Sequence, residues 1–256
     1  MKEPILLGST GDEIALEIDS VGSVSAVICC HGFCSERTSG GRFLQLSETL
    51  EARGFDVIRF DFRGCGDSAD ADLTEASLLD DLLRVLRFAK ERGYRRLYLY
   101  GHSLGSYLCM AVCSRYPEET ADVAAMALTG CMTGPMHYVW SLYYSADQMR
   151  ELAETRVLTL NGLRPDDRVT RVSASLLERF DTVDQAALCN GILCPTLLIN
   201  GGGDDEERRL AANSVRAISL LPAGSRLLVL SEASHNFRAQ YPEVIRAVAG
   251  YFQWML

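Results

Sequence analysis

Short apolar segments alternate with longer amphipathic ones along most of this 256-residue chain. The short segments are β-branched or continuously apolar, as strands buried on both faces of a sheet are, and they occupy residues 25–30, 55–61, 96–100 and 123–129. In the segments between them apolar residues recur at helical spacing, which predicts helices over residues 42–53, 75–92 and 106–116. Repeated strand–helix units predict an α/β fold, with a mainly parallel sheet and helices on both of its faces.

The two ends of the chain extend this sheet. Residues 5–7 and 14–18 flank a glycine-containing turn, which predicts an antiparallel hairpin at the start. Near the C-terminus the alternation resumes, with a strand at 195–200, a helix from about 206 to 220, a strand at 226–230 and a last helix. The sheet is therefore predicted to be eight-stranded.

Residues 133–190 interrupt the alternation after the sixth predicted strand. They contain a group of aromatic residues followed by polar segments with helical spacing, and no strand is predicted among them. A separate domain is the alternative, but because the chain then returns to complete the same sheet, we interpret this segment as an inserted helical cap. The predicted organisation is one core, formed by residues 1–132 and 191–256, with the cap at 133–190.

The net charge and the apolar runs of the chain argue against some classes of binding partner. The formal net charge is −9, which argues against nucleic acid and anionic membrane surfaces as partners. Residues 1–7 lack the basic start and long apolar stretch of a secretory signal, and no apolar run approaches the length of a membrane span. We therefore expect a cytoplasmic monomer or homodimer that acts on a small molecule.

The cysteines do not form a metal-binding pattern. The chain has nine cysteines and four histidines, and it contains no Cys-x-x-Cys motif. Cys29 and Cys30 lie in a predicted strand, and Cys109 and Cys113 lie four residues apart in a predicted helix. These positions are typical of free thiols that act as small buried apolar side chains in a reducing compartment. No metal or other cofactor is expected.

The strongest candidate for chemistry is Ser103, in the pentapeptide Gly-His-Ser-Leu-Gly at residues 101–105. It stands between the apolar run that ends at Tyr100 and a predicted helix. A Gly-x-Ser-x-Gly pattern at a strand-to-helix bend is typical of a nucleophile on a tight, strained turn, with glycines where side chains would crowd that turn. An ordinary surface loop is the alternative, and the position between strand and helix argues against it.

A serine hydroxyl is a weak nucleophile that needs a base. Of the four histidines, His235 lies in a polar loop between the last strand and the last helix, at the edge of the sheet where Ser103 is expected. His31 directly follows a strand, His102 lies inside the pentapeptide and is expected to point away from the serine, and His137 lies in the predicted cap. His235 is therefore the predicted base.

An acid should orient the base, and it should follow a strand between the serine and the histidine. The strand at 123–129 ends without a carboxylate, whereas the strand at 195–200 is followed by Gly-Gly-Gly-Asp-Asp-Glu-Glu. Asp204 is the predicted acid, with Asp205 as its competitor. Glu206 and Glu207 are interpreted as residues that cap the next helix through its dipole.

The remaining parts of the expected site are oxyanion donors and substrate contacts. The backbone N–H of Leu104, after the serine, and that of Phe33, in the loop after an early strand, are the predicted oxyanion donors. Aromatic residues of the predicted cap are candidates to wall an apolar pocket, although aromatic residues between helices often serve only packing. The candidate substrate-binding residues are His31, His137, Trp140, Tyr143 and Tyr144.

With these residues assigned, the chain resembles the α/β-hydrolase superfamily over nearly its whole length. The matching features are His31-Gly32-Phe33, the turn Asp-Phe-Arg-Gly-Cys-Gly-Asp-Ser at 61–68, the pentapeptide at 101–105, Asp204 and His235. The His-Gly-Phe loop, this turn and the modest cap are most similar to the cinnamoyl/feruloyl esterase-like branch, near the serine aminopeptidase-type hydrolases. The chain departs from that branch at Leu104, where those esterases often carry glutamine, and its Gly-Gly-Gly-Asp-Asp stretch is looser than usual.

The resemblance and the residues together predict a serine hydrolase that cleaves a carboxylic ester of a small acyl or aromatic acid through an acyl-enzyme. A thioesterase or an acyltransferase in a biosynthetic pathway would use the same three residues, so both remain alternatives. A binding protein of the same fold without catalysis is the third reading, and it is disfavoured because every position that catalysis needs carries a competent residue.

Overall fold

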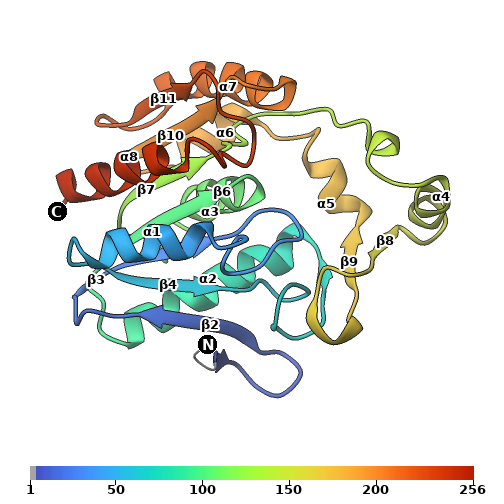
Figure 1. The fold of residues 1–256 in the computed structure, drawn as a ribbon, viewed down its shortest axis with the longest axis horizontal. Helices are drawn as coiled ribbons and strands as arrows, with labels where there is room; N and C mark the ends of the chain where they lie inside the picture. The colour runs from blue at the N-terminus through green and yellow to red at the C-terminus, as the bar shows by residue number, and fades with distance from the viewer. Residues whose placement is uncertain (1–3) are drawn as a thin grey trace.

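A computed structural model of the chain describes residues 4–256, so residues 1–3 of the predicted core segment lie outside the described residues. Its main sheet has eight strands in the order β1-β2-β4-β3-β6-β7-β10-β11 (Figure 1). The strands are β1 (Ile5–Leu7), β2 (Ile14–Asp19), β3 (Ser25–Cys30), β4 (Asp56–Phe60), β6 (Arg96–His102), β7 (Val123–Thr129), β10 (Thr196–Gly201) and β11 (Arg226–Leu230). The predicted eight-stranded α/β sheet is confirmed.

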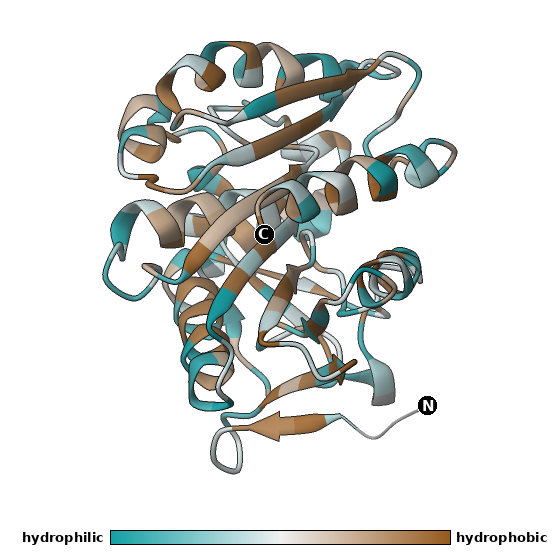
Figure 2. Ribbon diagram, turned by 90° about the vertical axis from the view of Figure 1, so that its left-hand side faces the viewer, coloured by the Kyte–Doolittle hydropathy of each residue, from teal (hydrophilic) through white to brown (hydrophobic). Residues whose placement is uncertain are grey.

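The main sheet is antiparallel at one edge and parallel over the rest. β1 and β2 form the predicted antiparallel hairpin, and β2 also pairs antiparallel with β4. From β4 to β11 all neighbouring pairs are parallel. β3, β4 and β10 are buried along their whole length and β6 and β7 over all but one residue, because helices cover both faces of the sheet (Figure 2).

Two apolar cores lie on the two faces of the sheet. The helices α1 (Arg42–Glu51) and α8 (Tyr241–Trp254) bury their apolar sides on one face. The opposite face is covered by α2 (Glu75–Glu91), α3 (Leu104–Arg115), α6 (Gln185–Asn190) and α7 (Asp205–Ala217), which leads into a short 3-10 turn, η3 (Ile218–Leu220). No helix among residues 4–256 is both long enough and apolar enough to cross a membrane.

The inserted segment differs from the prediction, because it contains strands. Its elements are η1 (Trp140–Leu142), α4 (Ala146–Thr155), β8 (Val157–Leu160), η2 (Pro165–Asp167), β9 (Thr170–Ser173) and α5 (Ala174–Arg179), followed by α6. β8 pairs antiparallel with β9, and β9 pairs parallel with β5 (Asp72–Leu73), which precedes α2 in the predicted core. In Figure 1 the elements α4, β8, β9 and α5 lie at one end of the molecule, apart from the main sheet, whereas α6 lies beside it.

The expectation of a purely helical cap was wrong. The strands β8 and β9 could not be recognised in the sequence because each is only four residues long. Segments this short contain too few positions to separate a strand period from a helix period. The insertion is also tied to the core at both ends, since β5 joins its small sheet and α6 packs against α3. The boundaries at 133 and 190 therefore stay a prediction.

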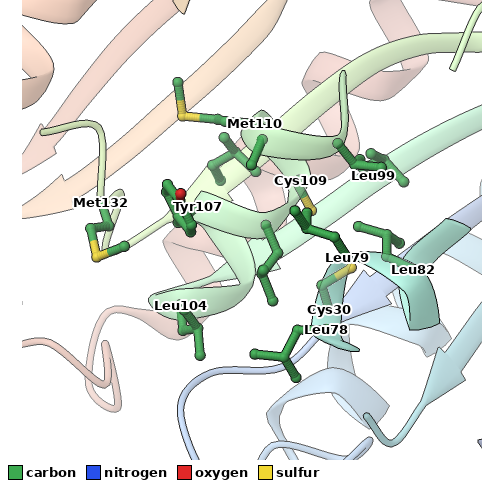
Figure 3. Packing of buried hydrophobic residues seen from close by; sticks show 14 of the residues in the cluster. Cys30, Leu78, Leu79, Leu82, Leu99, Leu104, Tyr107, Cys109, Met110 and Met132 are labelled. Atoms are coloured by element: carbon green, nitrogen blue, oxygen red, sulfur yellow. The ribbon is translucent and has the colours of Figure 1, made fainter. Parts of the chain in front are cut away.

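Helix α3 lies at the centre of the molecule and is apolar on all sides. Leu104, Tyr107, Cys109 and Met110 of this helix pack against apolar residues of β3, β6 and α2 (Figure 3). A helix that is apolar all round is buried on all sides, and this burial fixes the place of the residue that precedes it, Ser103.

We expect Gly105→Ala to destabilise the protein by about 3 kcal/mol, because a Cβ there overlaps backbone that has no room to move. It would lie 2.6 Å from the carbonyl oxygen of His31 and closer still to that of Cys30. Gly250→Ala in α8 is the matched control: a Cβ there meets no atom within 4 Å, and alanine is favoured by about 1 kcal/mol in a helix. Urea unfolding of both variants checks the expectation, and equal stabilities would contradict it.

Candidate active site

Ser103 stands at the bend between β6 and α3 in a strained backbone conformation. Its φ is 54° and its ψ is −121°, which is a costly region for a residue with a side chain. The neighbouring backbone holds it there: the N–H of Ser103 donates to the carbonyl of Thr129 at 2.9 Å. Its own carbonyl accepts from the N–H of Ser106 at 2.8 Å and from the Ser106 hydroxyl at 2.6 Å. The predicted tight turn is therefore present, and it presents the hydroxyl beyond the end of the strand.

His235 lies in the loop between β11 and α8, as the sequence predicts. Its Nε2 is 2.9 Å from Oγ of Ser103, which is hydrogen-bonding distance for transfer of the hydroxyl proton. The loop backbone is fixed by a hydrogen bond from the N–H of His235 to a carboxylate oxygen of Asp204, 3.0 Å long. About a quarter of the His235 side chain, 25%, is exposed.

The carboxylate that faces His235 belongs to Glu207, in the first turn of α7. Nδ1 of His235 donates to Oε1 of Glu207 over 2.6 Å. The Glu207 side chain is fully buried, and its second oxygen accepts the N–H of Gly201 at 2.5 Å. Gly130 leaves room for this pair, because a Cβ there would stand 2.9 Å from Cε1 of His235 and its φ of +56° also disfavours a side chain.

The assignment of Asp204 as the orienting acid is corrected, since its carboxylate does not contact the imidazole. Asp204 is the N-cap of α7, where Oδ1 accepts the N–H of Glu207 at 2.8 Å and Oδ2 accepts the N–H of His235. Its competitor Asp205 is exposed and pairs with Arg208 within the helix. Asp204 and Glu207 have the spacing of a capping box, and the buried glutamate of that pair turns back toward the sheet edge and meets the histidine.

The surroundings of His235 favour its charged form. Burial by itself lowers the pKa of His235, but the hydrogen bond to Glu207 and the charges of Glu206, Glu207 and Asp204 outweigh burial and raise the pKa above its usual 6.5. The carboxylate of Glu206 lies on the other side of the ring from Glu207, with one oxygen 3.9 Å from Nε2 of His235. A carboxylate at Nδ1 stabilises an imidazolium, which forms when the base accepts a proton.

The raised pKa sets the expected pH dependence. A base must be neutral, so kcat/KM for an ester should fall as the pH drops through a pKa above 6.5. Glu206→Gln removes a negative charge that raises this pKa, so the fall should move to lower pH. Asp205→Asn is the control, because the exposed Asp205 side chain is not among the groups that raise the pKa. A pH–rate profile of each variant checks this, and an upward or absent shift in Glu206→Gln would contradict it.

The predicted oxyanion donors lie beside Ser103. Leu104 is the first residue of α3, so its N–H has no partner within the helix and points out of the helix N-terminus. The Gly32-Phe33 segment passes close to the serine, since a Cβ on Gly32 would stand 3.4 Å from Cβ of Ser103. Both N–H groups therefore belong to segments that border the nucleophile.

A pocket of about 360 Å³ opens over Ser103 and His235. The predicted residues Trp140, Tyr143 and Tyr144 line it. Further lining residues, which the sequence pattern does not single out, include Ser35, Arg42, Tyr138, Phe180, Glu206 and Asn236. The aromatic rings pack on one another: Tyr138 stacks on Trp140 with centroids 4.9 Å apart, and Phe33 meets Phe180 edge to face at 6.0 Å.

Two of the candidate substrate-binding histidines lie elsewhere. His31 is buried with 1% of its surface exposed, and its ring nitrogens are used by the carbonyl of Gly32 and the N–H of Phe62. It therefore serves the backbone of the loop, and this expectation is corrected. His137 is largely exposed near Asp181 and does not line the pocket.

His102 lines the pocket, although it was expected to point away from the serine. Its Nδ1 is hydrogen-bonded to the hydroxyl of Thr129. Burial holds the pKa of His102 well below 6.5.

A mostly parallel sheet, a strained serine between a strand and a helix, and a histidine–carboxylate pair at the same edge define the class of α/β hydrolases. The chain belongs to the family described as serine aminopeptidase, S33, whose model matches residues 23–191. The resemblance inferred from the sequence is thereby confirmed. Glu207 and His235 lie after the matched span.

Proteins similar to this chain in sequence include animal lipases. The chain is 29% identical to the chicken (Gallus gallus) lysophosphatidylserine lipase ABHD12 over 167 residues, which is 62% of this chain and 43% of the relative. It is 32% identical to the Macaca fascicularis protein of the same name, over 62% of this chain and 42% of the relative. The chain thus spans less than half of the length of these relatives.

Solved structures share the fold at low identity. Est1E from Butyrivibrio proteoclasticus with bound ferulic acid superposes with a TM-score of 0.75 at 17% identity, over 98% of both chains. A monoacylglycerol lipase from Paleococcus ferrophilus superposes with a TM-score of 0.74 at 18% identity, over 95% of this chain and all of the lipase. These similarities show the fold.

Proposed function

We propose that this protein is a carboxylic ester hydrolase that works through an acyl-enzyme on Ser103. One observation carries the proposal: Oγ of Ser103 is 2.9 Å from Nε2 of His235, whose Nδ1 is 2.6 Å from the buried carboxylate of Glu207. A nucleophile, a base and an orienting acid in this contact order form the arrangement that activates serine for acyl transfer.

The first half of the reaction forms the acyl-enzyme. His235 takes the proton of Ser103 as its oxygen attacks the ester carbonyl carbon, and Glu207 stabilises the imidazolium. The N–H groups of Phe33 and Leu104 hold the carbonyl oxygen as it gains negative charge. When the carbon–oxygen bond to the alcohol breaks, His235 gives its proton to the leaving alkoxide. In the second half, His235 deprotonates a water molecule, whose attack releases the carboxylic acid and returns the proton to Ser103.

The pocket supports a substrate with a small acyl or aromatic part. Its volume is about 360 Å³, and aromatic rings from the insertion form much of its lining. Such walls favour flat or apolar groups through burial of apolar surface. The bound ferulic acid of Est1E and the lipase names of the sequence relatives are consistent with an ester of this kind.

We also propose that the protein works in a reducing compartment, the cytoplasm. Its nine cysteines are all free, and most are buried. Burial raises the pKa of the Cys189 thiol to about 11, so this thiol stays protonated and unreactive. Fractionation of the cells that make the protein tests the location.

An activity screen separates ester hydrolysis from its alternatives. Purified protein is assayed with p-nitrophenyl esters of graded chain length, hydroxycinnamoyl esters and acyl thioesters, each with and without an added alcohol or amine. We expect turnover of short or aromatic esters, with free acid as the product. Faster thioester turnover, or transfer of the acyl group to the added nucleophile, would favour a thioesterase or an acyltransferase. No turnover of any substrate would contradict the proposal.

A further inference from the structure

A second cleft, of about 440 Å³, adjoins the pocket over Ser103. The two share Ser35, Arg42 and Asn236 as lining residues, so a molecule in one can extend into the other. Their characters differ. The pocket is walled by aromatic rings, whereas the lining of the cleft is mainly polar and includes Ser39, Gln45 and the two arginines Arg42 and Arg238.

Arg42 brings an uncompensated positive charge to the junction of the two spaces. Its guanidinium donates only to neutral oxygens: Nε to the carbonyl of Ser39 at 3.0 Å, one terminal nitrogen to the Ser39 hydroxyl at 2.9 Å, and the other to the carbonyl of Asn236 at 2.6 Å. No ion pair of the described residues includes Arg42. An arginine has five N–H donors, so two remain for a ligand while three hold the side chain in place.

Arg238 adds a second such charge at the cleft. It is exposed, and the ion pairs of residues 4–256 do not include it. The carboxylate of the adjoining loop, Glu36, forms no ion pair with either arginine: its oxygens accept from the N–H and hydroxyl of Thr38 and from the N–H of Gly40. Burial raises the pKa of Glu36, but these hydrogen bonds outweigh burial and lower it. By contrast, Arg37 pairs with Glu17 and Asp61. In a chain of net charge −9, two unpaired arginines in one cleft favour an anionic ligand.

We infer that this cleft binds an anionic group, a phosphate or a carboxylate, on the alcohol or acyl part of the ester that Ser103 attacks. The inference rests on the proposed function, because the cleft matters as a continuation of the pocket. Arginine presents planar paired N–H groups that fit both kinds of anion. The ester carbonyl would lie at Ser103, the apolar part of the substrate against the aromatic rings, and the anion between Arg42 and Arg238.

Three short esters test the inference without forming micelles: 1-butyrylglycerol, 1-butyrylglycerol 3-phosphate and 3-butyrylglycerate. We expect kcat/KM to be about tenfold higher for at least one anionic ester than for the neutral one, since a charged hydrogen bond contributes about 1.5 kcal/mol or more. This ratio should fall toward one in Arg42→Gln and in Arg238→Gln, and it should also fall as salt screens the charges. Arg246→Gln, an exposed arginine of α8 that does not line the cleft, should keep the ratio. The phosphate and carboxylate arms show which anion the cleft prefers.

The outcomes separate this inference from the proposed function. Turnover of the neutral ester without preference for either anionic one overturns the inference and leaves ester hydrolysis intact. A preference that persists in Arg238→Gln, or that salt does not change, also overturns it. If no ester is cleaved, calorimetry with Ser103→Ala still decides, because 1-butyrylglycerol 3-phosphate or 3-butyrylglycerate must bind more tightly than 1-butyrylglycerol. Arg42 also donates a hydrogen bond to the carbonyl of Asn236 in the His235 loop, so its replacement can disturb the base as well as the charge. The Arg238→Gln variant therefore measures the effect of the charge without that disturbance.

Discussion

A Ser103→Ala variant is expected to lose ester hydrolysis on the order of 10⁶-fold in kcat, because no other group can form the acyl-enzyme. The residual rate would come from binding and the oxyanion donors, which the substitution leaves in place. Steady-state and single-turnover rates with the best ester of the activity screen measure the loss. The matched control is Ser219→Ala, an exposed serine in the 3-10 turn Ile218–Leu220, which should keep full activity.

Folding is separated from chemistry in this experiment. Ser103 is the residue before α3, and its hydroxyl makes no capping bond to the helix, so alanine removes no bond that holds the helix in place. The thermal midpoint should therefore change by only a few degrees. A folded Ser103→Ala variant with more than a few per cent of wild-type activity would contradict the role of this serine.

Glu207→Gln is expected to lower kcat on the order of 10⁴-fold, with the fold retained. The amide oxygen can still accept the N–H of Gly201, but an amide NH₂ in place of the oxygen at Nδ1 forces the imidazole to carry its proton on Nε2. In that tautomer Nε2 no longer accepts the proton of Ser103, so the base is lost.

Asp204→Asn is the matched control for Glu207→Gln, because it changes a neighbouring carboxylate to its amide in the same turn. Asparagine caps helices as well as aspartate, but it has a single amide oxygen, so it keeps the cap bond to the N–H of Glu207 and loses the bond to the N–H of His235. The contacts of the His235 ring with Glu207 and Ser103 are kept, so a loss far smaller than that of Glu207→Gln is expected. If Asp204→Asn loses far more activity than Glu207→Gln, the acid is Asp204 after all and the described contact is not the catalytic one.

The main sheet could be predicted because parallel strands covered on both faces are continuously apolar, so β3, β6 and β7 stand out from the amphipathic helices between them. Ser103 and His235 could be named because the pentapeptide fixes one and the small number of histidines singles out the other. The four-residue strands β8 and β9 were missed because they are too short to show a strand period, and because one partner of β9, the strand β5, lies far away in the chain.

Glu207 was missed for a different reason. Sequence distance from the strand end pointed to Asp204, but α7 begins at Asp205, and its first turn brings the third residue back over the end of β10. A helix boundary shifted by one residue changes which carboxylate faces the histidine, and boundaries are the least certain part of a sequence-based prediction. The cleft beside the pocket could not be predicted from the sequence either, because Arg42 and Arg238 line one cleft only in the folded chain.

A fluorophosphonate probe shows whether Ser103 is an activated nucleophile. The probe forms a covalent bond to an activated serine, which intact mass spectrometry and peptide mapping locate. We expect one adduct per chain, on Ser103, which is absent in Ser103→Ala and forms far more slowly in Glu207→Gln. A folded protein that stays unlabelled, or one that carries the adduct on another residue, would contradict it.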